Sequence, residues 1–189
     1  AEYMNVTNDL TVSFLELIST PDYPGLGPGI RNTVEKPSEL NAKVRDWSNT
    51  RHLNAELIDL LRSAALLWHD HLDASHSISQ SISSATGSFL HGIMHRREPD
   101  YGNSKYWFHR VGTHPAYAEI AKQILTQPFG GDVSPNLNSL IESGEWDPFG
   151  FVDLVSRELA DSADQSVIEE LQRIQEIEFQ CLVRSFFEV

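Results

Sequence analysis

Cysteine, cationic residues and long apolar runs are all scarce in this chain of 189 residues. The single cysteine, Cys181, excludes an internal disulfide, which fits a reducing compartment, so we expect a soluble cytoplasmic protein. No run of about 18 apolar residues is present, so no membrane partner is expected. Lys and Arg number 14 against 27 Asp and Glu, which disfavours nucleic-acid binding because phosphate contacts need clustered cations.

The negative charge lies in the two ends of the sequence. Residues 1–60 hold nine acids and five bases, and residues 116–189 hold fourteen acids and four bases. Residues 61–115 hold four acids and five bases, so this middle segment is slightly cationic even when its histidines are neutral. The ends are typical of a solvated acidic surface, and the middle segment therefore stands apart from the rest of the chain.

Helical periodicity dominates the sequence, and no segment has the alternation of a strand ladder. One long helical run covers residues 51–82, with a bend or break expected near 73–75. Shorter helices are predicted at about 10–19, 88–97, 104–111, 116–125 and 148–160, and Gly- and Pro-rich loops such as 21–30 separate them. The prediction is an all-α fold, a single bundle-like domain over residues 1–189 with about six to seven helices.

The last predicted helix begins after Ser166 and is amphipathic. Its apolar side chains recur three or four residues apart, which is the spacing of one helix face. A buried stripe of this kind also makes Cys181 a small core residue rather than a reactive thiol. The residues of the stripe are Val167, Leu171, Ile174, Ile177 and Cys181.

Histidine is concentrated in one stretch of the chain. Seven of the eight histidines fall between His69 and His114, a window of 46 residues in which even spreading would place about two. This clustering is the strongest functional signal in the sequence. Residues 68–115 are therefore the predicted site segment.

The spacing of these histidines favours a metal site between helices. On one continuous helix, His69, Asp73 and His76 would share a face, and His91 and His95 share a face of the next helix. Helix bundles build metal sites from such facing side chains. The predicted ligands are His69, Asp73, His91 and His95. Histidines with one carboxylate suit a divalent transition metal, namely Zn, Fe, Mn or Ni.

Further polar residues are predicted to be catalytic beside this metal. A metal with an open position lowers the pKa of bound water to about 7 and so makes a nucleophile. His76 and His109 would carry protons, while Arg96 and Arg110 would stabilise negative charge. The expected protein is a metal-dependent enzyme with hydrolase, lyase or isomerase chemistry on a small polar or anionic substrate. Fe or Mn would also allow oxygen chemistry.

Three alternatives stay open from the residues alone. In the first, the same histidines and arginines form a metal-free binding module for an anionic or sugar ligand. In the second, His69 and Asp70 resemble the metal-binding pair of HD-type phosphohydrolases, with His52 upstream and Asp153 downstream as candidates for the remaining ligands. In the third, the C-terminal amphipathic helix forms a homodimer, and the histidines are buried structural groups.

A longer resemblance covers about a quarter of the chain. The segments WHDHLDASHSISQ and GSFLHGIMHRREPDYGNSKYWFHRVGTHP, residues 68–80 and 87–115, resemble a block shared by uncharacterised bacterial and fungal proteins. The resemblance implies that the site lies within this block, and it implies no particular reaction. The residues that it assigns to the block are His69, Asp73, His76, His91, His95, Arg96, Asp100, Asn103, Trp107 and Arg110.

Overall fold

The computed structural model describes residues 2–131 and 133–188, with side chains from residue 9 onward. Every regular element in this part of the chain is a helix, so the all-α prediction is confirmed. None of the described helices is long and apolar enough to cross a membrane. The helices are α1 (Glu2–Leu17), α2 (Pro37–Asn49), α3 (Ala55–Trp68), α4 (Leu72–Ser79), α5 (Ala85–Arg97), α6 (Tyr101–Val111), α7 (Ala116–Leu125), α8 (Ser134–Ser139), α9 (Pro148–Ala160) and α10 (Gln165–Phe186).

The described helices outnumber the six to seven predicted, partly because the long run 51–82 is divided. α3 ends at Trp68 and α4 begins at Leu72, so the break lies at residues 69–71 rather than near 73–75. Asp70 has a φ of 66°, a left-handed conformation that costs a non-glycine residue on the order of 1–3 kcal/mol. Its carboxylate accepts hydrogen bonds from Arg31 Nε at 2.8 Å and Arg97 Nη2 at 2.9 Å. These bonds offset the backbone cost and fix the break.

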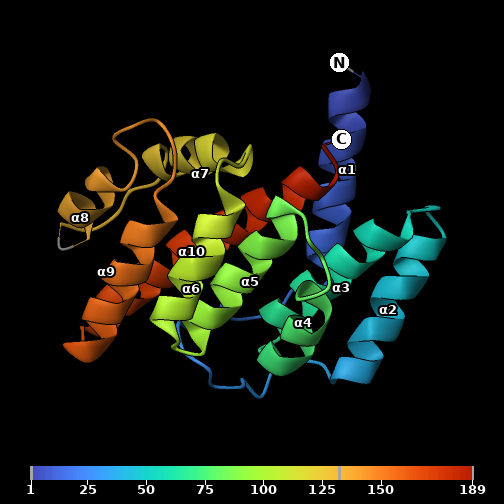
Figure 1. Cartoon of the computed structure of the whole chain (residues 1–189), viewed down its shortest axis with the longest axis horizontal. Coiled ribbons are helices and arrows are strands. Elements are labelled where there is room, and N and C mark those ends of the chain that lie inside the picture. The colour runs from blue at the N-terminus through green and yellow to red at the C-terminus, as the bar shows by residue number, and fades with distance from the viewer. Residues whose placement is uncertain (1, 132, 189) are drawn as a thin grey trace.

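The α5–α6 hairpin lies at the front of the bundle and carries most of the site segment (Figure 1). Ser84 and Asp100 cap the two helices through their side chains, accepting from the backbone N–H groups of Gly87 and Asn103 respectively. A Cβ atom on Gly92 would lie only 2.9 Å from the Phe108 ring, so glycine at this position allows the two helices to approach closely. The close approach fixes the register of the hairpin.

α10 crosses the bundle and supplies the largest apolar stripe. Four of its predicted stripe residues are buried, and Ile177 is partly buried and packed on the same core. α10 packs against α7 and α1 on its way through the molecule (Figure 1). Cys181 is buried, as predicted, and burial raises the pKa of its thiol to about 12. The stripe that a homodimer would use is thus covered by the chain's own helices.

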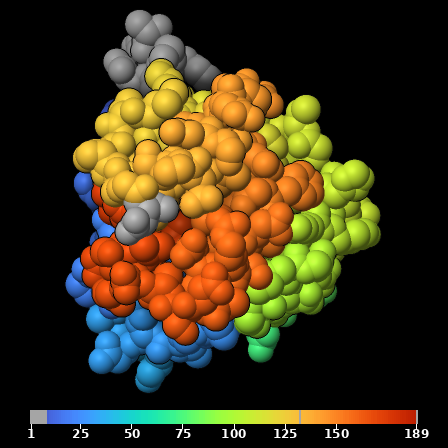
Figure 2. Space-filling view, turned by 90° about the vertical axis from the view of Figure 1, so that its left-hand side faces the viewer, coloured from blue at the N-terminus to red at the C-terminus, as the bar shows by residue number. Residues whose placement is uncertain are grey.

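The helices α8 and α9 cover one side of the molecule. Figure 2 shows α8 and α9 there, with α6 beside α9. α9 begins as its sequence predicts, because Asp147 caps it by accepting the Gly150 N–H at 3.0 Å and Pro148 occupies the first turn.

Candidate metal centre

Three imidazoles from two helices meet beside the α5–α6 hairpin. His76 comes from the last turn of α4, while His91 and His95 lie one turn apart on α5. The ring centroids are 4.5 Å apart for His76 and His91, 5.4 Å for His76 and His95, and 4.8 Å for His91 and His95. One nitrogen from each ring lies within 4.8 Å of the other two. Nitrogens around tetrahedral zinc stand about 3.4 Å apart, so these side chains would have to rotate to close around an ion, above all the stacked rings of His91 and His95.

His91 is the least satisfied polar group of the cluster. Its side chain is buried, and neither ring nitrogen has a hydrogen-bond partner within the described residues. Buried polar groups are nearly always bonded, and an unbonded one costs roughly 1–3 kcal/mol. Trp107 stacks on the ring at 3.8 Å between centroids and 9° between planes, so the indole covers one face of the imidazole. A buried imidazole without partners among the described residues is a candidate metal ligand.

The protonation state of His91 favours coordination. Burial, and then the proximity of His76 and His95, lowers the pKa of His91 to about 3. The ring is therefore neutral near pH 7, and neutral imidazole is the form that binds a metal. The neighbouring imidazoles and burial disfavour protonation of His91, and the same arrangement offers nitrogen lone pairs to a metal cation.

His95 is oriented by a carboxylate. Its Nδ1 lies 2.7 Å from Glu98 Oε2, and Asn103 Nδ2 lies 3.2 Å from its Nε2. Both contacts agree with the tautomer in which Nδ1–H donates to Glu98 and Nε2 accepts from Asn103. A metal-bound histidine commonly donates its other ring N–H to a carboxylate in this way. Asp100 extends the arrangement into a second group of possible donors with His95 and Glu98.

Two predicted ligands, His69 and Asp73, lie outside the cluster. His69 accepts the Glu35 N–H at Nδ1 at 3.0 Å, and its Nε2 is 2.8 Å from the Ile18 carbonyl. These contacts tie two loop segments to the end of α3, so both ring nitrogens serve the fold. Asp73 is exposed in the first turn of α4. The break at residues 69–71 explains the position of His69, since it separates this residue from the helix that carries His76. Asp73 remains on α4 with His76, but its side chain is exposed and does not join the three imidazoles.

The four residues predicted to be catalytic lie in different environments. His76 lies within the histidine cluster itself rather than outside it. Arg96 is fully buried and is directed to α10, where it pairs with Glu178. His109 is exposed on α6. Arg110 is exposed too, and its guanidinium lies 5.2 Å from the centroid of Trp107, the ring that stacks on His91.

The pair His69-Asp70 of the phosphohydrolase alternative is occupied by structural contacts. The Asp70 carboxylate is held by two arginines, and His69 by two backbone groups. His52 is exposed, and Asp153 is an exposed partner of Lys105 at 2.5 Å. None of these four residues belongs to a group of metal donors in the part of the chain that the structure describes.

The spacing argument did not include the two residues of α6 that complete the site, Asn103 and Trp107, which only the resemblance had named. His91 and His95 are four apart on α5, and Asn103 and Trp107 are four apart on α6. Residues 98–100 join these helices in a tight turn, which makes the neighbours antiparallel. In antiparallel register His91 faces Trp107 and His95 faces Asn103, as observed.

Comparison of the chain with models of protein families, with curated proteins and with solved structures finds no match. The resemblance of residues 68–115 to an uncharacterised family therefore stays a prediction.

Proposed function

We propose that the protein is a metal-dependent enzyme. It binds one divalent transition metal ion, preferably zinc, on His76, His91 and His95. The observation that carries the proposal is the buried His91 ring, which lacks hydrogen-bond partners in the described residues and has two further imidazoles within reach. Catalytic zinc sites use three protein ligands and leave a fourth position open. Three imidazoles suit zinc better than the oxygen-preferring ions Mg²⁺ and Ca²⁺.

The proposed reaction is hydrolysis of a small polar or anionic substrate. Water in the open position would have its pKa lowered to about 7 and would act as the nucleophile. Glu98 would hold His95 in the productive tautomer and increase its basicity. The Asn103 amide would be released from His95 when that ring binds the ion, and its N–H would then be free to donate to the substrate.

Arg110 is the residue best placed to select an anionic group. It stands over Trp107 and has a hydrogen bond to Tyr106 Oη at 3.3 Å. Within residues 9–131 and 133–188 no carboxylate pairs with it. A guanidinium of this kind can grip a phosphate or carboxylate with two parallel hydrogen bonds.

The cluster is accessible from solvent. His76, Asn103 and Trp107 are partly exposed. Glu98, the partner of His95, also borders a cleft of about 360 Å³ that Asp70, His71 and α4 line. That volume falls in the range of small-molecule sites, roughly 300–1,000 Å³.

The test uses tag-free protein in metal-free and zinc-loaded forms with chromogenic carboxylic esters and phosphate esters. We expect hydrolysis that a chelator abolishes, that added zinc restores, and that His76→Ala removes. Arg110→Gln should retain zinc but raise KM for anionic esters more than for neutral ones. His52→Asn is the matched control, because His52 is exposed, lies outside the cluster, and has a positive φ of 55° that asparagine tolerates.

Two results would contradict the proposed enzyme. If zinc-loaded protein hydrolyses none of these esters, the proposed hydrolytic reaction is contradicted. Metal-free protein that binds phosphate or carboxylate ligands as tightly as the loaded form would favour the binding module instead.

A further inference from the structure

A separate small cavity lies where α1, the loop after it, the end of α3 and α10 meet. Its volume is about 150 Å³, well below the roughly 300–1,000 Å³ of sites for drug-sized ligands. Its walls include Leu15 from α1, Trp68 from the end of α3, and Phe179 from α10. None of the cluster histidines lines it, so any ligand here is independent of the metal centre.

The charges in the cavity wall are of one sign. The lining holds the carboxylates of Asp22 and Glu176 and no Lys, Arg or His. Asp22 is already engaged, since it pairs with Arg31 at 3.1 Å and accepts from Thr33 at 2.7 Å. Glu176 has no hydrogen bond or ion pair with any residue whose side chain is described. Its side chain is partly buried, and burial raises the pKa of its carboxyl group while the charge of Arg173 lowers it.

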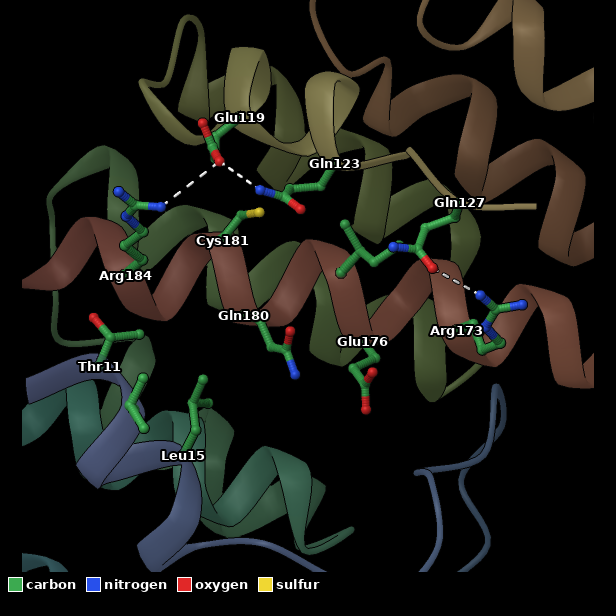
Figure 3. Close-up of a pocket in the computed structure, with 12 residues that line it drawn as sticks. Thr11, Leu15, Glu119, Gln123, Gln127, Arg173, Glu176, Gln180, Cys181 and Arg184 are labelled. Carbon is green, nitrogen blue, oxygen red and sulfur yellow. Dashed lines mark hydrogen bonds and ion pairs between the residues drawn. The ribbon is translucent and has the colours of Figure 1, made fainter. Parts of the chain in front are cut away.

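The nearby arginines do not supply the missing partner. The cavity adjoins a groove along α10, and Glu176 and Gln180 line both. Arg173 Nη2 in that groove donates to Gln127 Oε1 at 2.9 Å, and Arg184 pairs with Glu119 at 3.7 Å. Figure 3 shows Glu176 and Gln180 projecting from α10 on the side that faces α1, away from both of these contacts. Glu176 thus lines the cavity without an ion-pair partner among the described residues, although the charge of Arg173 is near.

Aromatic rings form much of the remaining wall. The Trp68 and Phe179 rings lie 4.9 Å apart between centroids, tilted by 37°, and Tyr23 stands exposed at the rim. Trp68 Nε1 donates to Thr20 Oγ1 at 3.0 Å, which fixes the orientation of the indole. Aromatic faces attract cations within about 6 Å of the ring centroid, most strongly for tryptophan.

We infer that this cavity binds a small organic ammonium ion, with the cationic nitrogen beside the Glu176 carboxylate and against the aromatic wall that Trp68 and Phe179 form. Its alkyl groups would contact Leu15 and Ile18. A metal cation does not fit the same lining, because hard cations need several oxygen ligands and one of the two carboxylates is already engaged. The site therefore takes an organic cation with an apolar surface.

The test measures binding of choline to the full chain by calorimetric titration at constant ionic strength. Its neutral isostere, 3,3-dimethylbutan-1-ol, has the same shape without the charge. We expect saturable one-site binding of choline and about tenfold weaker binding of the isostere, given the usual strength of cation–π contacts and paired charges. Glu176→Gln should weaken choline binding about tenfold, and the control Glu169→Gln, an exposed acid on the same helix, should leave it unchanged.

Three outcomes would overturn the inference. Equal affinity for choline and the isostere would show an apolar pocket with no preference for cations. Choline binding that survives Glu176→Gln, or that falls equally in Glu169→Gln, would show that Glu176 is not its partner. Absence of saturable binding by wild-type protein with an intact melting transition would show that no ammonium site exists.

Discussion

Helix α5 buries two sets of polar side chains, and the two sets differ in their hydrogen-bond partners. Arg96 and Arg97 are buried and hold specific partners, whereas His91 is equally buried and holds none in the described residues. Arg96 pairs with Glu178 at 2.7 Å, and Arg97 pairs with Asp70 at 2.9 Å. The arginines therefore maintain the fold, whereas His91 has no structural partner among the described residues.

The arginine contacts connect distant segments of the chain. Glu178 accepts from Arg96 and also from Trp146 Nε1 at 3.0 Å, so α5 is joined to α10 and to the start of α9. Only Nε of Arg96 lacks a partner. Arg97 donates to the carbonyls of Gly27 and Leu67, which holds the Gly/Pro loop on α3. Neither arginine has a free charge to offer a substrate.

The largest expected effect comes from breaking the arginine set. Glu178→Leu would leave the Arg96 guanidinium without a carboxylate in the core, which typically costs about 3–5 kcal/mol of unfolding free energy. Urea denaturation measures the loss. The double variant Arg96→Met with Glu178→Leu should recover most of it, because no unpaired charge then remains buried. A loss below about 1 kcal/mol in the single variant would contradict a structural role for the pair.

A second effect concerns His114, a buried histidine outside the cluster whose ring has structural partners. Burial lowers the pKa of His114 to about 4, and its ring bonds Thr86 Oγ1 and the Ala116 N–H. In the unfolded chain His114 binds a proton with a pKa near 6.5. The contribution of neutral His114 to the free energy of unfolding is therefore complete above that pH and is lost as pH falls toward 4. The difference is worth about 3 kcal/mol. His114→Asn should reduce the slope of stability between these pH values, as measured by denaturation, and an unchanged slope would contradict this.

A third effect concerns the carboxylate behind His95. Glu98→Gln keeps the size of the side chain but removes the charge that orients the ring, and such changes typically lower metal affinity about 10–100-fold. Competition with a chromogenic zinc chelator measures the affinity. Glu39→Gln is the control, since Glu39 is an exposed acid on α2. Equal zinc affinity in the two variants would show that Glu98 does not support the site.

The smallest effect is the most informative about the comparison. His91→Leu in metal-free protein should leave the unfolding free energy unchanged or raise it by up to about 1–2 kcal/mol, because an unbonded polar group is replaced by an apolar one. Thermal and urea denaturation of the metal-free protein measure it. A loss as large as that of Glu178→Leu would show that His91 is held by the fold rather than prepared for a ligand.

Local signals in the sequence were sufficient for the helices and for part of the site. The Asp147–Pro148 start, the α10 stripe and the shared face of His91 and His95 all depend on residues close together in the chain. The break at Asp70 depends on Arg31 and Arg97, which are distant in sequence, so local spacing could not reveal it. Arg96 is similar, because Glu178 is 82 residues away and decides that its charge is structural.

Zinc stoichiometry tests the central claim most directly. Tag-free protein would be stripped of metal, loaded with zinc, freed of excess by dialysis, and measured by elemental analysis alongside His91→Ala, His76→Ala and the control His109→Ala. The account predicts one zinc per chain in wild type and in His109→Ala, and none in the two cluster variants. A wild-type protein that retains no zinc, or a His91→Ala variant that retains it in full, would contradict a metal centre on His76, His91 and His95.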